Sequence, residues 1–409
     1  MAVLTGFRII ESSMLLNGAA TGMMLVDLGA EVIKVESPGM GDYIRLPETR
    51  HLHLQTNKGK KSLALDLKQE SGREILHRLL ETADAFVTNA VAGANEKLGV
   101  GYEQLRARKP DIVYCQNTGF GATGPFGHVP SHGQMMDAMG GALPFTMGED
   151  GLAVPKDDYV RRTNTLVSAG DGVSMGAIYA AFHIAAALAR RERTGEGAYI
   201  DVSSAQAVVA SAWLAVTTQI NRPERRGWWQ DPANTRPVAR YQAYAARDGK
   251  MLLFCPEEEK FWSKFCDLVG RPDLVPEKRG EPLRHEIQAI LATRDRSDWL
   301  AMASEHRLPI GPINDGIDEV LADPQIASRP MFATGEAEGK KFTYIGQPAI
   351  VDGESYSAPQ AAPELGQDNH ELLCELGFDD AAIARLEADR VIAAPPAKRH
   401  IISAIYGDE

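Results

Sequence analysis

The chain has 409 residues, of which 44% are hydrophobic and 24% charged, and its formal net charge is −12. This is the composition of an ordinary globular protein, long enough for two domains. The acidic balance and the lack of a sustained basic run exclude nucleic acid as an expected partner, so an anionic ligand would be met locally by a few cations or by helix ends.

The four cysteines are too few for a disulfide framework in so long a chain, and no two of them have metal-ligand spacing. They are Cys115, Cys255, Cys266 and Cys374. We therefore expect reduced thiols and no metal. The N-terminal stretch MAVLTGFRIIESS lacks the basic and apolar regions of a signal peptide, and no apolar run reaches membrane-spanning length. These features predict a cytoplasmic protein that does not enter a membrane.

The first third of the chain alternates strand and helix patterns. Residues 7–11 predict a strand, and a glycine-punctuated segment, 15–22, leads into a predicted helix over 23–28. The alternating run EVIKVE at 31–36 predicts a second strand, and this βαβ opening predicts a parallel sheet. Further strands are predicted within 57–67 and at 85–87, 112–117 and 199–202, and helices at 70–81, 102–107, 131–143 and 204–216.

Three features of this region invite a functional interpretation. Lys58, Lys60 and Lys61 form the one local concentration of positive charge, which is either a solvated loop or a site for ligand phosphates. Asn89 follows the strand at 85–87, and ligands of parallel sheets bind beyond the carboxyl ends of the strands. A turn-rich loop, GFGATGP at 119–125, also follows a strand.

Asp171 lies between two glycines, directly before an alanine-rich apolar stretch that ends in RRERTGEG. The spacing of the apolar residues predicts a buried helix, which Gly195 ends. One interpretation of Asp171 is an N-cap, which accepts hydrogen bonds from free N–H groups and stabilises by about 1 kcal/mol. The other is a nucleophile, whose charge the helix end favours and which the flanking glycines leave open to close approach.

His132 stands at the start of the predicted helix over 131–143, and it is the one histidine whose position suggests chemistry. A lone histidine is more often a satisfied structural group than a catalytic one. Both interpretations stay open from the residues alone.

The remainder of the chain predicts a smaller second domain, followed by a C-terminal part that returns to the first domain. Residues 222–238 are rich in Pro, Arg and Trp without a period, as in a linker or an active-site loop. A hairpin is predicted over 241–254 around Asp248 and Gly249, with helices at 260–269, 282–291 and 298–306. The tail predicts two short helices separated by Gly377. We expect domain limits of 1–220, 221–325 and 326–409, the last part returning to the first domain.

The order of these segments resembles the family III CoA-transferases, the CaiB–BaiF type that includes formyl-CoA transferase and carnitine CoA-transferase. The resemblance covers nearly the whole chain, and the order and spacing of the segments are more specific than any one of them. The segments that resemble the family are DLGAEVIKVESPGMGD, NKGKKSLALDLK, KLGVGYEQLRARKPDIVYC, GFGATGP, GDGVSMG followed by RRERTGEG, IGPINDGIDEVLADPQ and ELGQDNHELLCELGF.

The resemblance implies an α/β fold with a large Rossmann-like domain, a smaller α+β domain and an interlocked, ring-like homodimer. It also implies that an acyl-CoA and a free carboxylic acid exchange CoA through an aspartyl–CoA thioester. The family's nucleophile falls on Asp171. No permanently bound cofactor is required, because the CoA thioester is a substrate.

The resemblance places CoA along loops at Leu15, Asn17, Leu65, Lys68, Asn89 and Lys97. The chain departs from the family pattern at 89–93, which reads NAVAG and lacks the usual aromatic residue and arginine. Lys97 also stands where an arginine is usual, and Ser37 where some members have one. The CoA contacts therefore depart from the family pattern, whereas the nucleophile matches it.

The nearest alternative is an α-methylacyl-CoA racemase, in which His132 and Asp171 would exchange a proton next to a thioester. The run Ser131-His132-Gly133 differs from the racemase motif, which favours the transferase.

A nicotinamide-dependent oxidoreductase is suggested only by the glycines around Asp171, far from the opening βαβ unit. The presence of Asp171, on which the family's nucleophile falls, argues against a catalytically silent subunit. The residues do not identify the acceptor acid, although Arg225, Arg226, Trp228, Trp229 and Arg236 offer groups for one.

Overall fold

The structure is a computed structural model, and it describes residues 3–143, 145–155, 171–221, 238–277, 279–329, 331–354 and 356–392. The arginines and tryptophans of the 222–238 loop named above lie outside the described residues. The chain forms two compact units. The larger comprises Met1–Arg161, Ser168–Ala212 and Ser328–Glu409, and the smaller comprises Arg162–Val167 and Trp213–Ala327. The domain limits given above stay predictions.

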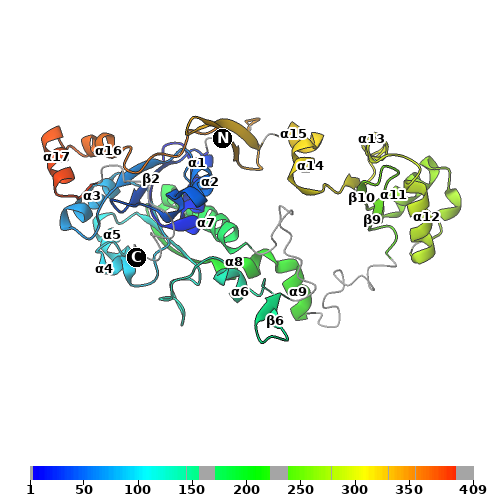
Figure 1. The fold of residues 1–409 in the computed structure, drawn as a ribbon, viewed down its shortest axis with the longest axis horizontal. Helices are drawn as coiled ribbons and strands as arrows, with labels where there is room; N and C mark the ends of the chain where they lie inside the picture. The colour runs from blue at the N-terminus through cyan, green and yellow to red at the C-terminus, as the bar shows by residue number, and fades with distance from the viewer. Residues whose placement is uncertain are drawn as a thin grey trace. The chain divides into compact units, whose positions relative to one another are not determined.

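A six-stranded, fully parallel sheet forms the centre of the larger unit (Figure 1). Its order, β3-β2-β1-β4-β5-β8, corresponds to the order 3-2-1-4-5-6 of Rossmann folds, with the reversal of direction between β1 and β4. The strands are β1 (Arg8–Ser12), β2 (Glu31–Glu36), β3 (Lys61–Ala64), β4 (Ala85–Thr88), β5 (Val113–Thr118) and β8 (Ala198–Ser203). The predicted parallel sheet is confirmed.

Two apolar cores cover the two faces of this sheet, because successive side chains of a strand point to opposite faces. Ile10 belongs to one core and Ile9 to the other. The first core includes helices α3 (Glu70–Glu81), α5 (Tyr102–Arg108), α16 (Asn369–Glu375) and α17 (Asp380–Ala388). The second includes α1 (Leu15–Asp27) and α7 (Gly172–Thr194). The predicted tail helices are confirmed.

Helix α7 is long and apolar enough, by length and composition, to cross a membrane, which differs from the prediction that no such stretch exists. Its Ala180, Ala181, Ile184 and Leu188 are buried in the core with the sheet. The helix is therefore a core helix of the larger unit.

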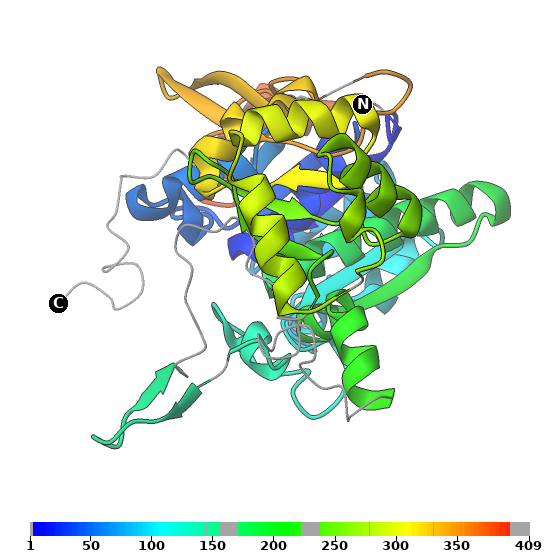
Figure 2. The same cartoon turned by 90° about the vertical axis from the view of Figure 1, so that its right-hand side faces the viewer.

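The larger unit carries further short elements. The hairpin of β6 (Phe145–Met147) and β7 (Ala153–Pro155) is the pair of teal arrows at the lower left of Figure 2. A second hairpin joins β12 (Phe332–Ala337) and β13 (Lys340–Ile345). The helices are η1 (Tyr43–Arg45), η2 (Pro47–Thr49), α2 (Arg50–Thr56), α4 (Ala94–Lys97), α6 (Met135–Met139) and α8 (Ser204–Ser211).

The smaller unit is an α+β structure with its own aromatic core. Strands β9 (Gln242–Ala245), β10 (Met251–Phe254) and β11 (Ile310–Pro312) form an antiparallel sheet, which confirms the predicted hairpin. Phe254, Trp262, Phe265 and Trp299 are buried together beside it. The helices of this part are α9 (Trp213–Asn221), α11 (Glu259–Leu268), η4 (Pro272–Leu274), α12 (Glu281–Leu291), α13 (Arg296–His306), α14 (Gly316–Ala322) and α15 (Pro324–Ser328).

Three predicted segments differ from the structure by more than two residues. The segment 15–22 is helical and belongs to α1, the helix over 131–143 is reduced to α6, and the helix over 204–216 is interrupted at Ala212 between α8 and α9. The first error has a clear cause. A Cβ on Gly18 would lie 2.2 Å from Ser13 Cβ, and one on Gly22 would lie 2.0 Å from Glu11 Oε2. These glycines let α1 approach β1 closely.

Both interpretations of the lysine cluster are wrong for Lys58 and Lys60. Lys58 is buried, and its Nζ donates to Asp27, to the Ile345 carbonyl and to the Tyr356 hydroxyl. Lys60 is buried against Glu11. Only Lys61 is partly exposed, and it pairs with Glu31 and Glu371. These cations are therefore neutralised within the fold.

Candidate active site

Asp171 is the N-cap of α7, and its side chain is half-buried. Its Oδ1 accepts from the backbone N–H groups of Val173 at 3.0 Å and Ser174 at 3.3 Å. Its Oδ2 accepts from the Ser174 hydroxyl at 2.6 Å. These hydrogen bonds confirm that Asp171 caps the helix. A capping carboxylate is also the type of group that attacks a carbonyl, so the cap does not exclude the nucleophile.

A second carboxylate, Asp137 of α6, lies at the same helix start. Its Oδ1 accepts from Gly172 N at 2.7 Å. The pKa of Asp137 is raised, first by burial and further by the charge of Asp171, against the hydrogen bond from Gly172. A Cβ on Gly172 would lie 2.8 Å from Met136 Cβ, so only glycine lets α6 approach this closely. Two carboxylates thus share the N-terminus of α7.

The start of α7 lies at the carboxyl edge of the parallel sheet, where ligands of such folds bind. Gly176 packs over Asn117, the next-to-last residue of β5, and over Ser204, directly after β8. Asn17 joins the same network. Its Nδ2 donates to the Asn117 carbonyl at 3.1 Å, and its Oδ1 accepts from Ser204 Oγ at 3.1 Å. Asn17 is thereby bonded to the same two residues that Gly176, five positions after Asp171, packs against.

The loop from β1 to α1 is held by side chains from a neighbouring strand and from two loops, at the point where the sheet reverses direction. Asn89 donates to the Met14 carbonyl at 2.6 Å and accepts from Met14 N at 3.0 Å. Leu15, with φ of +61°, donates its N–H to Asp42 Oδ1 at 2.9 Å. Lys34 Nζ donates to the Ser13 carbonyl. The structure therefore brings the predicted residues Leu15 and Asn89 together and orders their loop from three sides.

A buried charge network of Glu11, Lys34, Asp42 and Lys60 lies beneath this loop. Glu11 accepts from Lys34 at 2.8 Å and from Lys60 at 2.6 Å, and Lys34 Nζ lies 3.1 Å from Asp42 Oδ2. All four side chains are buried. The network contains two cations and two carboxylates, so its formal charges balance, and each charge has a partner, as buried charges require.

Burial and pairing move the pKa values of this network in different directions. Burial acts to raise the pKa of Glu11, but the two lysines outweigh it and lower that pKa. Burial acts to lower the pKa of Lys34, but Glu11 and Asp42 raise it above the usual value. Burial lowers the pKa of Lys60 to about 8, with the charge of Lys34 adding to the fall against the attraction of Glu11.

The remaining predicted CoA residues are spread along the same part of the larger unit. Leu65 follows β3, but its side chain is buried in the core and its N–H donates to the Glu36 carbonyl. Lys68 and Lys97 are exposed, the latter at the end of α4. With strands about 4.8 Å apart, β3 and β5 are separated by roughly 19 Å. The predicted residues therefore follow an elongated line rather than a compact pocket.

His132 is exposed and lies in the turn before α6, not at the start of the helix. Its backbone N–H points to Met135 Sδ at 3.3 Å, and its carbonyl accepts from Met135 N. Within the described part of the chain, no hydrogen bond joins His132 to Asp171. The contact between this segment and α7 is made by Asp137, which the sequence analysis did not single out.

A sequence profile of CoA-transferase family III matches residues 4–369 of the chain. The chain belongs to the family III CoA-transferases. It is 30% identical over 400 residues to the succinate–glutarate CoA-transferase of Agrobacterium fabrum, with 91% of this chain and 95% of the relative covered. It is 32% identical over 417 residues to the succinyl-CoA:mesaconate CoA-transferase of Haloarcula hispanica, with 95% and 100% covered.

Solved structures agree with this membership. A CAIB/BAIF family protein from Brucella suis superposes with a TM-score of 0.69 at 26% identity, covering 92% of this chain and 99% of that protein. This family III CoA-transferase thus has the mixed α/β fold that the resemblance implied. The named relatives are transferases, which does not favour the racemase alternative.

The oxidoreductase alternative rested on the glycines near Asp171. In this family III CoA-transferase, the helix that follows the opening strand is α1, whereas α7 precedes the last strand of the sheet. Gly172 and Gly176 serve close packing against α6 and the ends of β5 and β8. Gly170 lies outside the described residues. The dinucleotide interpretation therefore has no support in the fold.

Sequence reasoning missed three residues of this site: Asp42, Asn117 and Asp137. The only signal for Asp137 is an acidic residue in the first turn of a predicted helix. Asn117 gives a comparable signal, since it lies near the end of a predicted strand, as Asn89 does. Asp42 acts on a residue 27 positions away, and no local pattern indicates that contact.

Proposed function

We propose that this enzyme transfers CoA from an acyl-CoA to a free carboxylic acid through a covalent aspartyl–CoA thioester on Asp171. The observation that supports it is the half-buried Asp171 carboxylate at the start of α7, on the carboxyl edge of the sheet, in a family III CoA-transferase. A silent subunit would not need this carboxylate.

The first half-reaction makes two exchanges. A carboxylate oxygen of Asp171 attacks the acyl-CoA carbonyl, the carbon–sulfur bond breaks, and CoA leaves as a thiolate. The product is a mixed anhydride between Asp171 and the acyl group. The thiolate then attacks the Asp171 carbonyl carbon, and the acyl group departs as a free carboxylate. The enzyme now carries the thioester, and its energy is conserved as long as water is excluded.

The second half-reaction reverses these steps with another acid. The acceptor carboxylate attacks the aspartyl thioester, CoA thiolate leaves, and the thiolate attacks the acceptor carbonyl to release a new acyl-CoA and free Asp171. The backbone N–H groups of Val173 and Ser174 are positioned to stabilise negative charge on the Asp171 carboxyl oxygen at each addition. The Ser174 hydroxyl can rotate away from Oδ2 and free that oxygen for attack.

CoA is proposed to lie along the carboxyl edge of the sheet. The main chain of Leu65 and the amine of Lys68 would meet one end of the molecule, and Leu15, Asn17 and Asn89 would border its path toward Asp171. Lys97 offers an exposed cation for a phosphate. Because two relatives are named as a succinate–glutarate CoA-transferase and a succinyl-CoA:mesaconate CoA-transferase, we propose succinyl-CoA as donor and a five-carbon dicarboxylate such as glutarate or mesaconate as acceptor.

We also propose that the enzyme is a cytoplasmic, interlocked homodimer. Apolar side chains exposed on the single chain support the assembly: Phe145, Met147, Leu152, Ile178, Phe182, Trp213, Leu214 and Ile220. Their burial by a second copy would remove a large apolar surface from water. All four cysteines are free thiols, which suits a reducing compartment.

The direct test supplies the purified enzyme with succinyl-CoA and with glutarate, mesaconate or oxalate, and follows acyl-CoA products by chromatography. We expect a new acyl-CoA and free succinate in equal amounts over many turnovers, and without an acceptor acid no new acyl-CoA and at most one succinate per active site. Because His132 is expected to orient rather than react, His132→Ala should slow transfer only moderately. Solvent deuterium appearing at the α-carbon of a 2-methylacyl-CoA without any acceptor would instead support the racemase.

A further inference from the structure

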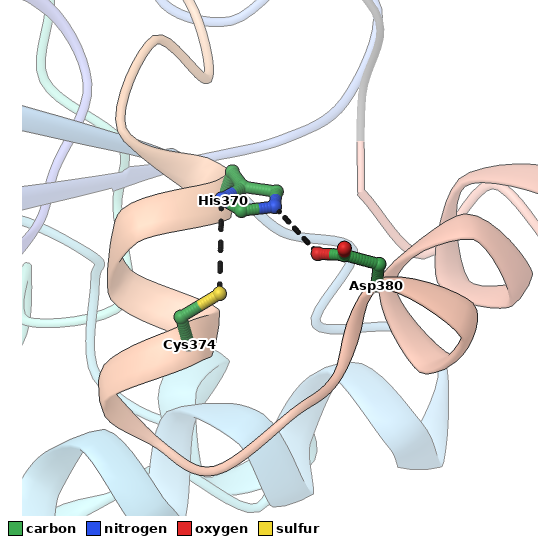
Figure 3. Close-up of side chains that lie close together, drawn as sticks. All are labelled: His370, Cys374 and Asp380. Carbon is green, nitrogen blue, oxygen red and sulfur yellow. Dashed lines mark hydrogen bonds and ion pairs between the residues drawn. The ribbon is translucent and has the colours of Figure 1, made fainter.

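Three metal-ligating side chains meet at the C-terminal helix pair, on elements that contribute nothing to the candidate active site. His370 and Cys374 lie one turn apart on α16, and Asp380 is the first residue of α17 (Figure 3). His370 Nε2 lies 2.9 Å from Asp380 Oδ1, and His370 Nδ1 lies 3.7 Å from Cys374 Sγ. One ligand atom from each residue lies within 4.8 Å of the other two.

We propose that His370, Cys374 and Asp380 form a binding site for Zn²⁺ or a similar divalent transition metal. A thiolate, an imidazole and a carboxylate are all zinc ligands, and the thiolate disfavours Mg²⁺ and Ca²⁺, which prefer oxygen. Three protein ligands leave the fourth tetrahedral position to water. The spacing of four residues between His370 and Cys374 puts both side chains on one face of α16.

The present geometry requires only side-chain movement to become a metal site. Tetrahedral bonds of about 2.0–2.3 Å place ligand atoms roughly 3.3–3.7 Å apart, so the widest separation must close by about 1 Å. The side chains of His370 and Asp380 are 68% and 90% exposed, and Cys374 is exposed as well. Rotation of these side chains displaces water rather than core atoms. The metal would replace the two hydrogen bonds of the cluster.

Metal binding here would join two helices that complete the core of the larger unit. Leu372 and Leu373 of α16 and Ile383 of α17 are buried with the sheet residues. The connection between the helices turns at Gly377, with φ of +84°. A metal held by residues on both sides of this turn would bind the folded pair but not the unfolded chain, and would stabilise it by mass action.

The spacing of the four cysteines relative to one another indicates no metal site, which is why none was expected from the sequence. The pattern here is a histidine and a cysteine at helical spacing, and its third member comes from the next helix. This inference is independent of the proposed function, because none of the three residues belongs to the candidate active site.

The experiment titrates the metal-free, full-length enzyme with Co²⁺ as a spectroscopic probe and with Zn²⁺ as competitor. We expect one equivalent of Co²⁺ to give tetrahedral d–d bands and a thiolate charge-transfer band, both displaced by Zn²⁺ with a Kd in the roughly micromolar range. Zn²⁺ should raise Tm by at least about 2 °C, and Mg²⁺ should not. Zn²⁺ should also protect Cys374 from alkylation.

Cys374→Ser should abolish the charge-transfer band and weaken Zn²⁺ binding at least about tenfold, and His370→Gln should weaken it similarly. Cys255→Ser is the matched control, because Cys255 is a half-exposed thiol of the smaller unit and should leave the spectrum unchanged. Unaltered Co²⁺ spectra in Cys374→Ser, or no Zn²⁺ protection of Cys374 from alkylation in the unmodified enzyme, would overturn the proposal. The alkylation readout needs no variant, so it stands even if a substitution disturbs folding.

Discussion

At the scale of single residues, the buried charges decide how the site loop is held. Glu11 accepts from both Lys34 and Lys60, and Lys34 also donates to the Ser13 carbonyl at the start of the β1–α1 loop. Removing one member of a buried network leaves its partners desolvated without compensation. Lys60 is part of the interior and is not available to a ligand phosphate.

Glu11→Gln should therefore destabilise the enzyme strongly. Two buried ammonium groups would lose their shared carboxylate, and we expect the free energy of unfolding to fall by about 3–5 kcal/mol, measured by urea denaturation. The matched control is Glu31→Gln, which breaks partly exposed pairs with Arg8 and Lys61. That change should cost less than about 1 kcal/mol. Equal losses for the two variants would show that the buried network has no special weight.

At the scale of elements, the strands of the sheet and the helices that pack on it were predictable, because each has a regular pattern of apolar and polar residues. The strand 31–36 and the helix 70–81 have the predicted limits. The failures occur where tertiary packing overrides local preference. Glycines favour a loop at 15–22, yet Gly18 and Gly22 are helical. Both positions need glycine because a Cβ would collide with Ser13 or Glu11.

The candidate site shows the same division. Asp171 lies at the start of a predicted helix and Asn89 follows a predicted strand, so both could be located from the sequence, whereas only the family resemblance indicated Asn17. Asp137 could not be ranked, because its bond to Gly172 joins residues 35 positions apart. Likewise, the left-handed Leu15 is supported by Asp42 from a separate loop. Such contacts depend on how helices pack and leave no periodic trace in the chain.

At the scale of the whole molecule, the exposed apolar residues bear on assembly. Ile178 and Phe182 are 44% and 65% exposed on α7, although the opposite side of that helix is buried. A helix apolar on most faces was predicted to be buried, and the single chain buries only one side. We attribute the exposed side to the proposed homodimer.

An interlocked dimer cannot separate without substantial unfolding, so dilution should not dissociate it. Sedimentation at nanomolar concentration should give a species of about twice the 44.4 kDa chain. Phe182→Asp, on the exposed side of α7, should reduce the yield of folded dimer rather than release a folded monomer. A reversible equilibrium between folded monomers and dimers would contradict the interlocked arrangement.

The covalent intermediate on Asp171 is the central claim, and mass spectrometry of the acylated enzyme tests it most directly. The enzyme is incubated with succinyl-CoA, denatured and digested after trapping with hydroxylamine or borohydride. We predict that the intact protein gains one coenzyme A less one water and that the trapped modification lies on Asp171. Asp171→Asn keeps the helix cap, because the asparagine Oδ1 can accept the same two bonds from the Val173 and Ser174 backbone N–H groups. This variant should nevertheless show no adduct and at least about a thousandfold lower activity, with the free energy of unfolding changed by less than about 1 kcal/mol.

Asp137→Asn, the control at the neighbouring carboxylate, should still form the adduct. A trapped modification on a peptide without Asp171, or near-full activity of Asp171→Asn without hydrolysis back to aspartate, would contradict the account.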